Sequence, residues 1–182
     1  MEKAHASLAE KTLSKKMGFD GELLKLEVEK VELPNKKIAT REIIRHPGAV
    51  AIVCLNEESK LVLVRQFRKP LDKTLLEIPA GKLEKGEDHL ECAKRELLEE
   101  TGYTARSWRR LGQTVTAPGF TDETIYLFLA TDVTAGIPSP DEDEFLKVES
   151  YTIDEVTEMI FRGVIDDAKS IVALFLSGIF TK

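Results

Sequence analysis

The chain has 182 residues, a length that suits one globular domain with a small N-terminal elaboration. A net charge of −6 argues against broad affinity for nucleic acid, and the lack of any apolar run of about 18 residues argues against a membrane-spanning helix. The polar N-terminus does not resemble a secretory signal, so a cytoplasmic location is expected. Cys54 and Cys92 are predicted to be buried, reduced thiols and not a disulfide or a metal-binding pair.

The N-terminal residues predict a small antiparallel sheet. Residues 1–18 are polar and are predicted to be partly disordered. Residues 23–33 alternate apolar and polar side chains as a strand does. Pro34 and Asn35 predict a turn, after which residues 37–46 can pair back. Two strands alone have too little core, so this sheet is expected to dock on the main domain or on a second subunit.

Pro47 and Gly48 mark a predicted boundary between an N-terminal β-hairpin subdomain, residues 1–46, and a main domain, residues 47–182. In the main domain strands alternate with helices, which indicates the α/β class with a mixed sheet covered on both faces. Strands are predicted at 49–55, 60–67, 74–81, 108–116, 123–130 and 146–151. Helices are predicted before Gly102, from Thr152 to near Gly163 through a capping box with Glu155, and from Asp166 or Asp167 to about Ser177.

Three carboxylates crowd one turn of the first predicted helix. Because successive residues are about 100° apart, Glu96, Glu99 and Glu100 share one face and repel each other. A solvated acidic helix face is the ordinary interpretation of such a run. The alternative is a bound cation, which would be a hard divalent ion because all the ligands are oxygens.

The residues on either side of the carboxylate cluster favour a bound cation over a solvated helix face. Gly81 and Gly86 bracket a short polar loop, and Glu87 and Asp88 place negative charge at the helix start. Gly102 suits the position just past the last turn. The helix also carries an apolar stripe that should pack on a sheet, formed by Leu90, Ala93 and Leu97. The acidic face therefore borders a buried face.

Arg95 is the cation closest to this cluster in the sequence. It can pair with Glu91 or with Glu99 at a spacing of four residues, which would hold part of the carboxylate set in place.

Residues 81–103 resemble the Nudix box, G-x5-E-x7-R-E-U-x-E-E-x-G-U, in which U is a bulky apolar residue. Tyr103 departs mildly from this pattern, since an aliphatic residue is commoner there, and the departure concerns packing and not chemistry. The resemblance implies a Nudix α/β/α sandwich from about residue 47 onward that hydrolyses a diphosphate linkage. The fixed positions of the box are filled by Gly81, Glu87, Arg95, Glu96, Leu97, Glu99, Glu100, Gly102 and Tyr103.

A diphosphate substrate calls for Mg²⁺, with Mn²⁺ as a substitute, because the ion neutralises phosphoryl charge and acidifies a bound water. Glu96 and Glu100 are the first-choice metal ligands. Glu99 is the third, and it is also a candidate catalytic residue. The resemblance further implies that the backbone carbonyl of Ala80 binds a metal, the alternative being simply a small residue where strand meets loop.

A general base must also reach the attacking water. In the ADP-ribose-cleaving branch that the chain resembles, a distal loop brings in a glutamate, and residues 140–145 (PDEDEF) are the candidate loop here. Glu144 is the first candidate base, because the Phe-Leu-Lys-Val segment after it fits the start of the next strand. Glu142 is the second. An ordinary acidic surface turn is the alternative.

Arginines are expected to bind the substrate phosphates, since a guanidinium makes bidentate contacts with them. Arg65 and Arg68 end a predicted strand that should point at the site. Arg68 resembles the family's phosphate-binding arginine, whereas a surface position is an equal alternative for Arg65. Arg41, in the N-terminal hairpin, is predicted to reach a substrate across a dimer interface, against the alternative of a surface charge.

The substrate is predicted from a second resemblance. Pro118 lies fifteen residues after Tyr103, a placement that resembles the marker of ADP-ribose pyrophosphatases. Gly119 and Phe120, in the same loop, are further substrate-binding candidates. Residues 41–50 and the run from 64 to 87 also look like bacterial members of that group.

This resemblance implies hydrolysis of ADP-ribose to AMP and ribose 5-phosphate. It also implies a homodimer whose N-terminal strands exchange and complete the nucleoside pocket. The partner is thus a small nucleoside diphosphate sugar, with no nucleic acid and no membrane. One alternative is a pyrophosphatase for another such sugar, for example GDP-mannose. Another is a non-catalytic ADP-ribose sensor, which the full set of box carboxylates disfavours.

Overall fold

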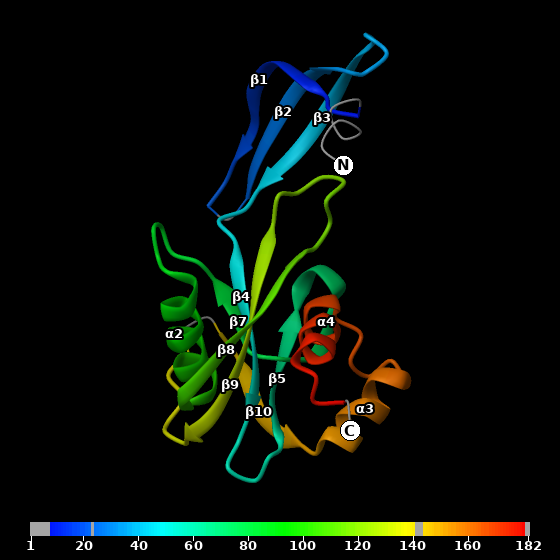
Figure 1. The fold of residues 1–182 in the computed structure, drawn as a ribbon. Coiled ribbons are helices and arrows are strands. Elements are labelled where there is room, and N and C mark those ends of the chain that lie inside the picture. Colours follow the sequence, from blue (N-terminus) through cyan, green and yellow to red (C-terminus); the bar gives the residue numbers. More distant parts are fainter. Residues whose placement is uncertain (1–7, 23, 141–143, 181–182) are drawn as a thin grey trace. The chain divides into compact units, whose positions relative to one another are not determined.

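The structure, a computed structural model, describes residues 8–22, 24–140 and 144–180. The chain divides into two compact units (Figure 1). The N-terminal unit contains the residues up to His46 together with Ala117–Glu123, and the main unit contains Pro47–Thr116 and the residues from Thr124 onward.

A three-stranded antiparallel sheet forms the N-terminal unit, in the order β1-β2-β3. The prediction of two strands after a partly disordered segment was wrong for β1, which spans Lys11–Asp20. Every residue of β1 is exposed, and Lys15 interrupts the alternate apolar positions Leu13, Met17 and Phe19, so the strand pattern is weak in the sequence. Its pairing with β2 (Lys25–Glu32) gives it backbone partners, and Lys15 adds an ion pair to Glu29 at 2.8 Å.

The loop Ala117–Glu123 extends the edge of β3 (Ile38–Arg45). The Ile44 N–H donates to the Phe120 carbonyl at 2.8 Å, and the Asp122 N–H donates back to the Ile44 carbonyl at 3.3 Å. The Arg45 guanidinium also contacts the Asp122 carboxylate at 3.1 Å. A segment distant in sequence therefore belongs to the N-terminal unit, although the sequence-based boundary assigns it to residues 47–182.

A seven-stranded mixed sheet forms the centre of the main unit. Its strands follow the order β10-β5-β4-β9-β8, while β6 pairs with β5 and β7 pairs with β4. The β4–β9 pair is parallel and the other pairs are antiparallel, so the predicted mixed sheet is confirmed. The strands are β4 (Ala49–Leu55), β5 (Leu61–Arg68), β6 (Lys73–Glu77), β7 (Ala80–Lys82), β8 (Thr104–Val115), β9 (Thr124–Thr134) and β10 (Leu146–Tyr151).

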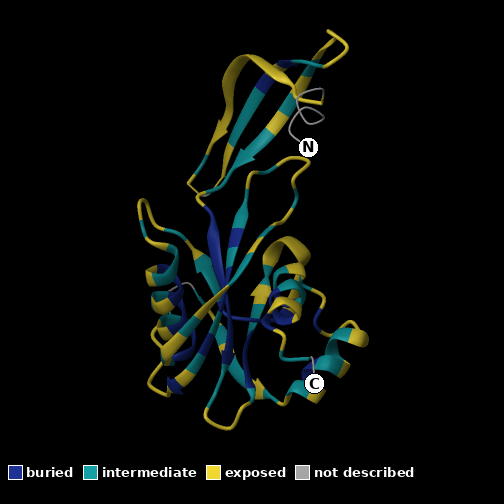
Figure 2. Cartoon of the chain, viewed as in Figure 1, coloured by how far each residue is buried: buried dark blue, intermediate teal, exposed yellow. Residues whose placement is uncertain are grey.

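Helices cover both faces of this sheet, which confirms the α/β/α sandwich (Figure 1). Successive residues of β4 point to opposite faces, and nearly all of them are buried (Figure 2). Ile52 belongs to the core cluster formed with α2 (His89–Thr101), and Val53 belongs to the cluster formed with α3 (Ile153–Phe161) and α4 (Ala168–Ser177). None of the described helices has the length and apolar character needed to cross a membrane.

One predicted strand, 74–81, is divided in the structure. β6 pairs with β5, and after Ile78 and Pro79 the chain continues as β7, which pairs with β4. Proline has no N–H for a ladder, and the Pro79 carbonyl instead accepts a hydrogen bond from the Ile52 N–H at 2.8 Å. This change of partner strand places Ala80 and Gly81 beside α2.

The predicted helix ends agree with the structure. The Thr152 hydroxyl and the Glu155 side chain form the predicted capping box at the start of α3. Of the two aspartates proposed to cap α4, Asp167 is the cap, because its side chain accepts from the Ser170 N–H at 3.2 Å. A short 3-10 turn, Lys69–Leu71, links β5 to β6.

Candidate active site

Helix α2 presents the carboxylate cluster at the edge of the buried core. The Asp88 side chain caps it by accepting from the Leu90 N–H at 2.8 Å, and Gly102 ends it in the left-handed conformation at φ 76°. The apolar stripe packs on β4 as predicted. Glu100 and Glu96 are therefore only 2% and 9% exposed, whereas the side chain of Glu99 is 35% exposed.

Gly81 is needed where β7 passes α2. A Cβ atom at this position would lie 1.8 Å from Cδ of Glu96, far inside any real contact distance. Only glycine therefore lets the Glu96 carboxylate lie against the backbone of β7. The first residue of the Nudix-like motif therefore has a steric role on which the position of Glu96 depends.

Burial makes the two inner carboxylates reluctant to ionise. Loss of solvent raises the pKa of Glu100 to about 8 and that of Glu96 to about 7. The Ala80 N–H opposes this at Glu100, since it donates to Oε2 at 3.0 Å, and the Arg95 charge opposes it at Glu96. The Glu144 carboxylate lies within electrostatic reach of both and raises the pKa of each further. A cation placed here would relieve buried negative charge.

Arg95 holds three of the box carboxylates at once. Its Nε donates to Glu87 Oε1 at 2.9 Å. Its Nη1 donates to Glu96 Oε1 at 2.8 Å and to Glu99 Oε2 at 2.9 Å. Hydrogen bonding to Arg95 lowers the pKa of Glu87 to about 2. The guanidinium thus fixes the orientation of Glu96 and Glu99 and leaves Glu100 outside its contacts.

Only one of the two predicted partners of Arg95 pairs with it in the structure. Its pairing with Glu99 is confirmed, whereas Glu91 pairs with Lys94 at 2.7 Å. The contact with Glu87 was missed, because Glu87 precedes the helix and helical spacing does not reveal it. Its only sequence signal was its fixed position in the box.

Arg68 lies close to the carboxylates, held by Glu77. Its Nε and Nη2 donate to the two Glu77 oxygens at 3.1 and 2.7 Å. Hydrogen bonding to Glu77 raises the pKa of Arg68, and the charge of Glu100 contributes to the same shift. The charges of Arg68 and Glu100 therefore act on each other, although the two residues belong to β5 and α2.

Arg65 is engaged elsewhere, by the Glu149 carboxylate at 3.0 and 2.9 Å. With Glu144 and neighbouring side chains it lines a hollow of about 430 Å³. Glu142, the second candidate base, lies outside the described residues. The other described residues that line this hollow are Phe67, Thr74, Phe145, Leu146 and Lys147.

The remaining predicted substrate contacts lie in the N-terminal unit. Arg41, on β3, pairs with Glu10 through its Nε at 2.9 Å. Pro118, Gly119 and Phe120 lie in the loop Ala117–Glu123, and the Phe120 side chain is 55% exposed. The structure therefore brings these four residues into one unit, whereas the α2 carboxylates and Arg68 belong to the other.

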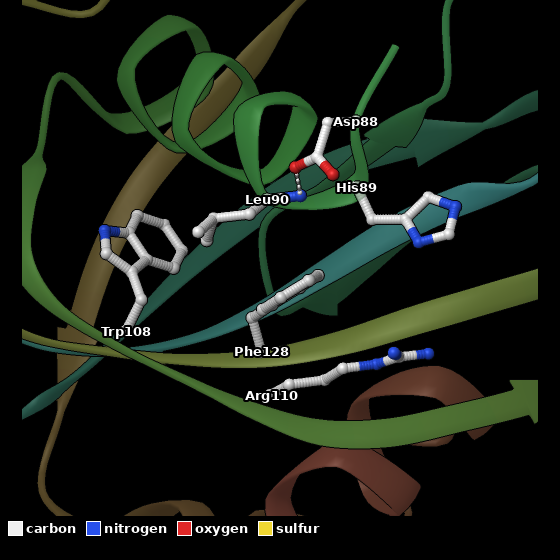
Figure 3. A pocket seen from close by; sticks show the side chains of 6 residues that line it. All are labelled: Asp88, His89, Leu90, Trp108, Arg110 and Phe128. Carbon is white, nitrogen blue, oxygen red and sulfur yellow. Dashed lines mark hydrogen bonds between the residues drawn. The ribbon is translucent and has the colours of Figure 1, made fainter. Parts of the chain in front are cut away.

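A second hollow, of about 280 Å³, lies at the N-terminal end of α2 (Figure 3). The His89 ring stacks on Tyr126 beside it, with ring centroids 3.5 Å apart. None of the predicted site residues that the structure describes lines this hollow. Its walls are Asp88, His89, Leu90, Trp108, Arg110 and Phe128.

The donor set of the inner carboxylates fits a hard divalent cation. Among residues 8–22, 24–140 and 144–180, no three Asp, Glu, His or Cys side chains already converge as a ready-made cation site. Glu96 and Glu100 nevertheless offer buried carboxylate oxygens whose ionisation burial opposes. Glu96 and Glu100 could hold Mg²⁺ together with the backbone carbonyl of Ala80, which the sequence predicts as a further ligand.

The raised pKa values predict how stability depends on pH and metal. The carboxyl groups of Glu96 and Glu100 bind their protons more tightly in the folded protein than in an unfolded chain, in which a glutamate keeps its ordinary pKa of 4.5. The stability that this tighter proton binding contributes is fully present below pH 4.5. It is lost as the pH rises through about 7 for Glu96 and about 8 for Glu100. Because Mg²⁺ binds the ionised forms, we expect it to raise the melting temperature more at about pH 8.5 than at about pH 6.

Calorimetry with and without Mg²⁺ at both pH values checks this expectation. Equal shifts would show that the metal does not bind these carboxylates.

Comparisons with known proteins agree with the geometry. The model of the NUDIX domain matches residues 45–174. The chain is 46% identical to the ADP-ribose pyrophosphatase of Bacillus subtilis (strain 168), over 92% of both chains. It is also 46% identical to the methanol dehydrogenase activator of Bacillus methanolicus, over 91% of this chain and 90% of that protein.

The fold has a close counterpart among solved structures. A crystal structure of an ADP compounds hydrolase superposes with a TM-score of 0.83 at 24% identity, over 92% of this chain and 91% of that one. At that identity the likeness concerns the fold. Because the NUDIX domain matches most of the chain and both relatives are 46% identical to it, the chain belongs to the Nudix family of hydrolases.

Proposed function

We propose that this enzyme uses Mg²⁺ to hydrolyse ADP-ribose to AMP and ribose 5-phosphate. The observation that carries the proposal is the pair of buried carboxylates, Glu96 and Glu100, beside the backbone of Ala80. The choice of substrate is supported by the ADP-ribose pyrophosphatase of B. subtilis, which is similar over nearly the whole chain.

Each group has a role in this proposal. A bound Mg²⁺ supplies charge neutralisation for the diphosphate and a lower pKa for a coordinated water. Glu96 and Glu100 hold the ion, and Glu99 is the third candidate ligand. Arg95 keeps Glu96 and Glu99 in fixed orientations through the contacts described above. Arg68 contacts a phosphate oxygen of the substrate.

Glu144 is proposed as the general base that takes the proton of the attacking water. Support comes from its charge, which acts on both Glu96 and Glu100. Glu144→Gln is expected to lower kcat by ~10²–10⁴-fold, because the amide cannot accept that proton. Steady-state kinetics at saturating Mg²⁺ measure the effect.

Glu142→Gln serves as the matched control, since it removes a carboxylate from the same loop. We expect it to keep turnover near that of the wild type. A crippled Glu142→Gln beside an active Glu144→Gln would transfer the role of base to Glu142.

A panel of nucleoside diphosphate sugars tests the proposed substrate. With Mg²⁺ present, we expect ADP-ribose to give the highest kcat/KM, with AMP and ribose 5-phosphate as products. Preferred release of GMP from GDP-mannose would instead support the alternative pyrophosphatase. Binding of ADP-ribose with no turnover of any sugar would indicate a sensor.

A second candidate function follows from the other relative. The methanol dehydrogenase activator of B. methanolicus is as similar to this chain as the pyrophosphatase is. We propose that this protein also stimulates a methanol dehydrogenase. The rate of methanol oxidation, measured with and without the protein, tests the idea, and an unchanged rate would reject it.

We further propose that the protein is a homodimer that associates through the N-terminal sheet. Strand β1 exposes apolar side chains that an interface would cover, namely Leu13, Met17 and Phe19. Arg41, Pro118, Gly119 and Phe120 of this unit are proposed to contact the nucleoside. Sedimentation equilibrium should find a dimer, and a fully active monomer would contradict the proposal.

A further inference from the structure

Glu77 is a charged residue that is buried at the end of β6. Its side chain is 2% exposed, between the apolar neighbours Leu76 and Ile78, which are also buried. A carboxylate at such a position destabilises the fold unless cations and hydrogen bonds compensate it. Packing alone therefore does not explain why a charged side chain occupies this position.

Two cations compensate the Glu77 carboxylate. Arg68 donates to both of its oxygens, and Lys169 Nζ donates to Oε2 at 2.6 Å. Burial alone would raise the pKa of Glu77, but Arg68 and Lys169 outweigh burial and hold it below the ordinary value. Lys169 in turn contacts Asp167 at 3.0 Å. Glu77 is therefore an ionised anchor within a neutral four-residue cluster.

The start of α4 fixes this anchor in place. The Ser170 hydroxyl, itself fully buried, accepts a hydrogen bond from the Ile78 N–H at 2.9 Å. Asp167 caps α4 and also holds Lys169. The end of β6 is thus attached to α4 through both its backbone and the Glu77 side chain, so the carboxylate has little freedom to move.

Among residues 8–22, 24–140 and 144–180, the hydrogen bonds of the Arg68 side chain involve one edge of the guanidinium. The pairing with Glu77 uses Nε and Nη2, and Nη1 takes no part in it. The Arg68 side chain is 37% exposed although its partner is buried. Its charge also reaches Glu100, a candidate metal ligand. A guanidinium fixed along one edge and open along the other is suited to receive a phosphate oxygen in a defined place.

We propose that Glu77 is a positioning residue, which aims the free edge of Arg68 at the substrate diphosphate with Lys169 as the second counter-charge. Glu77 touches neither substrate nor metal in this arrangement and acts through Arg68. The inference rests on the proposed diphosphate hydrolysis, because that reaction gives Arg68 its phosphate.

A double-mutant cycle tests the inference. Glu77→Gln keeps the shape of the side chain but removes the charge that holds the guanidinium. We expect it to lower kcat/KM by ~10–100-fold in the wild-type background. In an Arg68→Ala background, Glu77→Gln should lower kcat/KM no further, because the guanidinium through which Glu77 acts on the substrate is already absent. Equal losses in both backgrounds would overturn the inference and show a general structural role.

Two further variants keep the cycle decisive. Glu77→Asp retains the charge and withdraws the carboxylate by one methylene group, so it tests positioning if Glu77→Gln fails to fold. It should lower kcat/KM only where Arg68 is present. Asp166→Asn is the matched control, because the Lys73–Asp166 pair, at 2.6 Å, also joins β6 to the start of α4. It should stay within about twofold of the wild type.

A spectroscopic readout separates this inference from the choice of substrate. The Arg68 Nε–H should give a solvent-protected NMR resonance in the wild type that Glu77→Gln abolishes. A resonance that survives in Glu77→Gln would overturn the positioning role, whatever substrate the enzyme cuts. A wild-type enzyme that cuts no diphosphate sugar would overturn the proposed function, while the resonance still decides whether Glu77 holds Arg68.

Discussion

Replacing Glu100 by glutamine is expected to lower kcat by ~10²–10⁴-fold at saturating Mg²⁺, with the fold intact. The amide oxygen can still accept the hydrogen bond that the Ala80 N–H gives to Oε2 at 3.0 Å. The negative charge that would hold the metal is lost. Because burial raises the pKa of Glu100 to about 8, removing the ionisable group should also leave the metal-free protein no less stable at high pH.

Kinetics and thermal melting of the same preparation measure both halves of this expectation. Glu91→Gln is the matched control, since Glu91 lies on the same helix and pairs only with the exposed Lys94 among its described contacts. It should stay within about twofold of the wild type. Wild-type turnover in Glu100→Gln would remove Glu100 from the metal site.

Gly81→Ala should have the second large effect, through sterics. The new methyl group would overlap Cδ of Glu96, whose carboxylate Arg95 holds by a hydrogen bond at 2.8 Å. Either the carboxylate or β7 must move, and a displacement of about 1 Å at a catalytic group costs roughly 10²-fold in rate. Overpacking should further destabilise the fold by about 1–3 kcal/mol. Kinetics and denaturant unfolding measure the two losses.

Gly86→Ala separates crowding from backbone strain. Gly86 has a positive φ of 81°, but a Cβ there would meet nothing within 4 Å. This variant should lose stability and keep its kcat, because no carboxylate is displaced. If Gly81→Ala behaved in the same way as Gly86→Ala, Gly81 would have no part in placing Glu96.

Helix α2 could be predicted from sequence because its signals are local. The Asp88 cap, the Gly102 end and the apolar stripe all lie within one continuous segment. Each depends on spacing along the chain, which the sequence displays directly. The burial of Glu96 and Glu100 then follows from their position next to that stripe.

The arginines and their partners could not be predicted in this way. Arg68 finds Glu77 across a turn, and Glu77 finds Lys169 at a distance of 92 residues along the chain. Arg65 is paired with Glu149, which lies 84 residues away. Long-range pairs of this kind depend on strand register and on the docking of α4, for which the sequence carries no periodic signal.

Strand β1 and the division of residues 74–81 escaped prediction for related reasons. β1 has no buried side, and charged and polar residues interrupt its few apolar positions, although its backbone pairs with β2. At Pro79 the missing N–H was a visible signal, but the change of partner from β5 to β4 depends on tertiary structure. That change is what brings Ala80 to Glu100.

Metal binding by α2 is measured most directly by titrating the metal-free protein with Mn²⁺ and following free Mn²⁺ by EPR. The wild type should bind the ion, Glu91→Gln should bind it equally well, and Glu96→Gln and Glu100→Gln should each weaken binding by at least about tenfold. Undiminished Mn²⁺ binding in both Glu96→Gln and Glu100→Gln would contradict a catalytic cation held by the buried carboxylates of this helix.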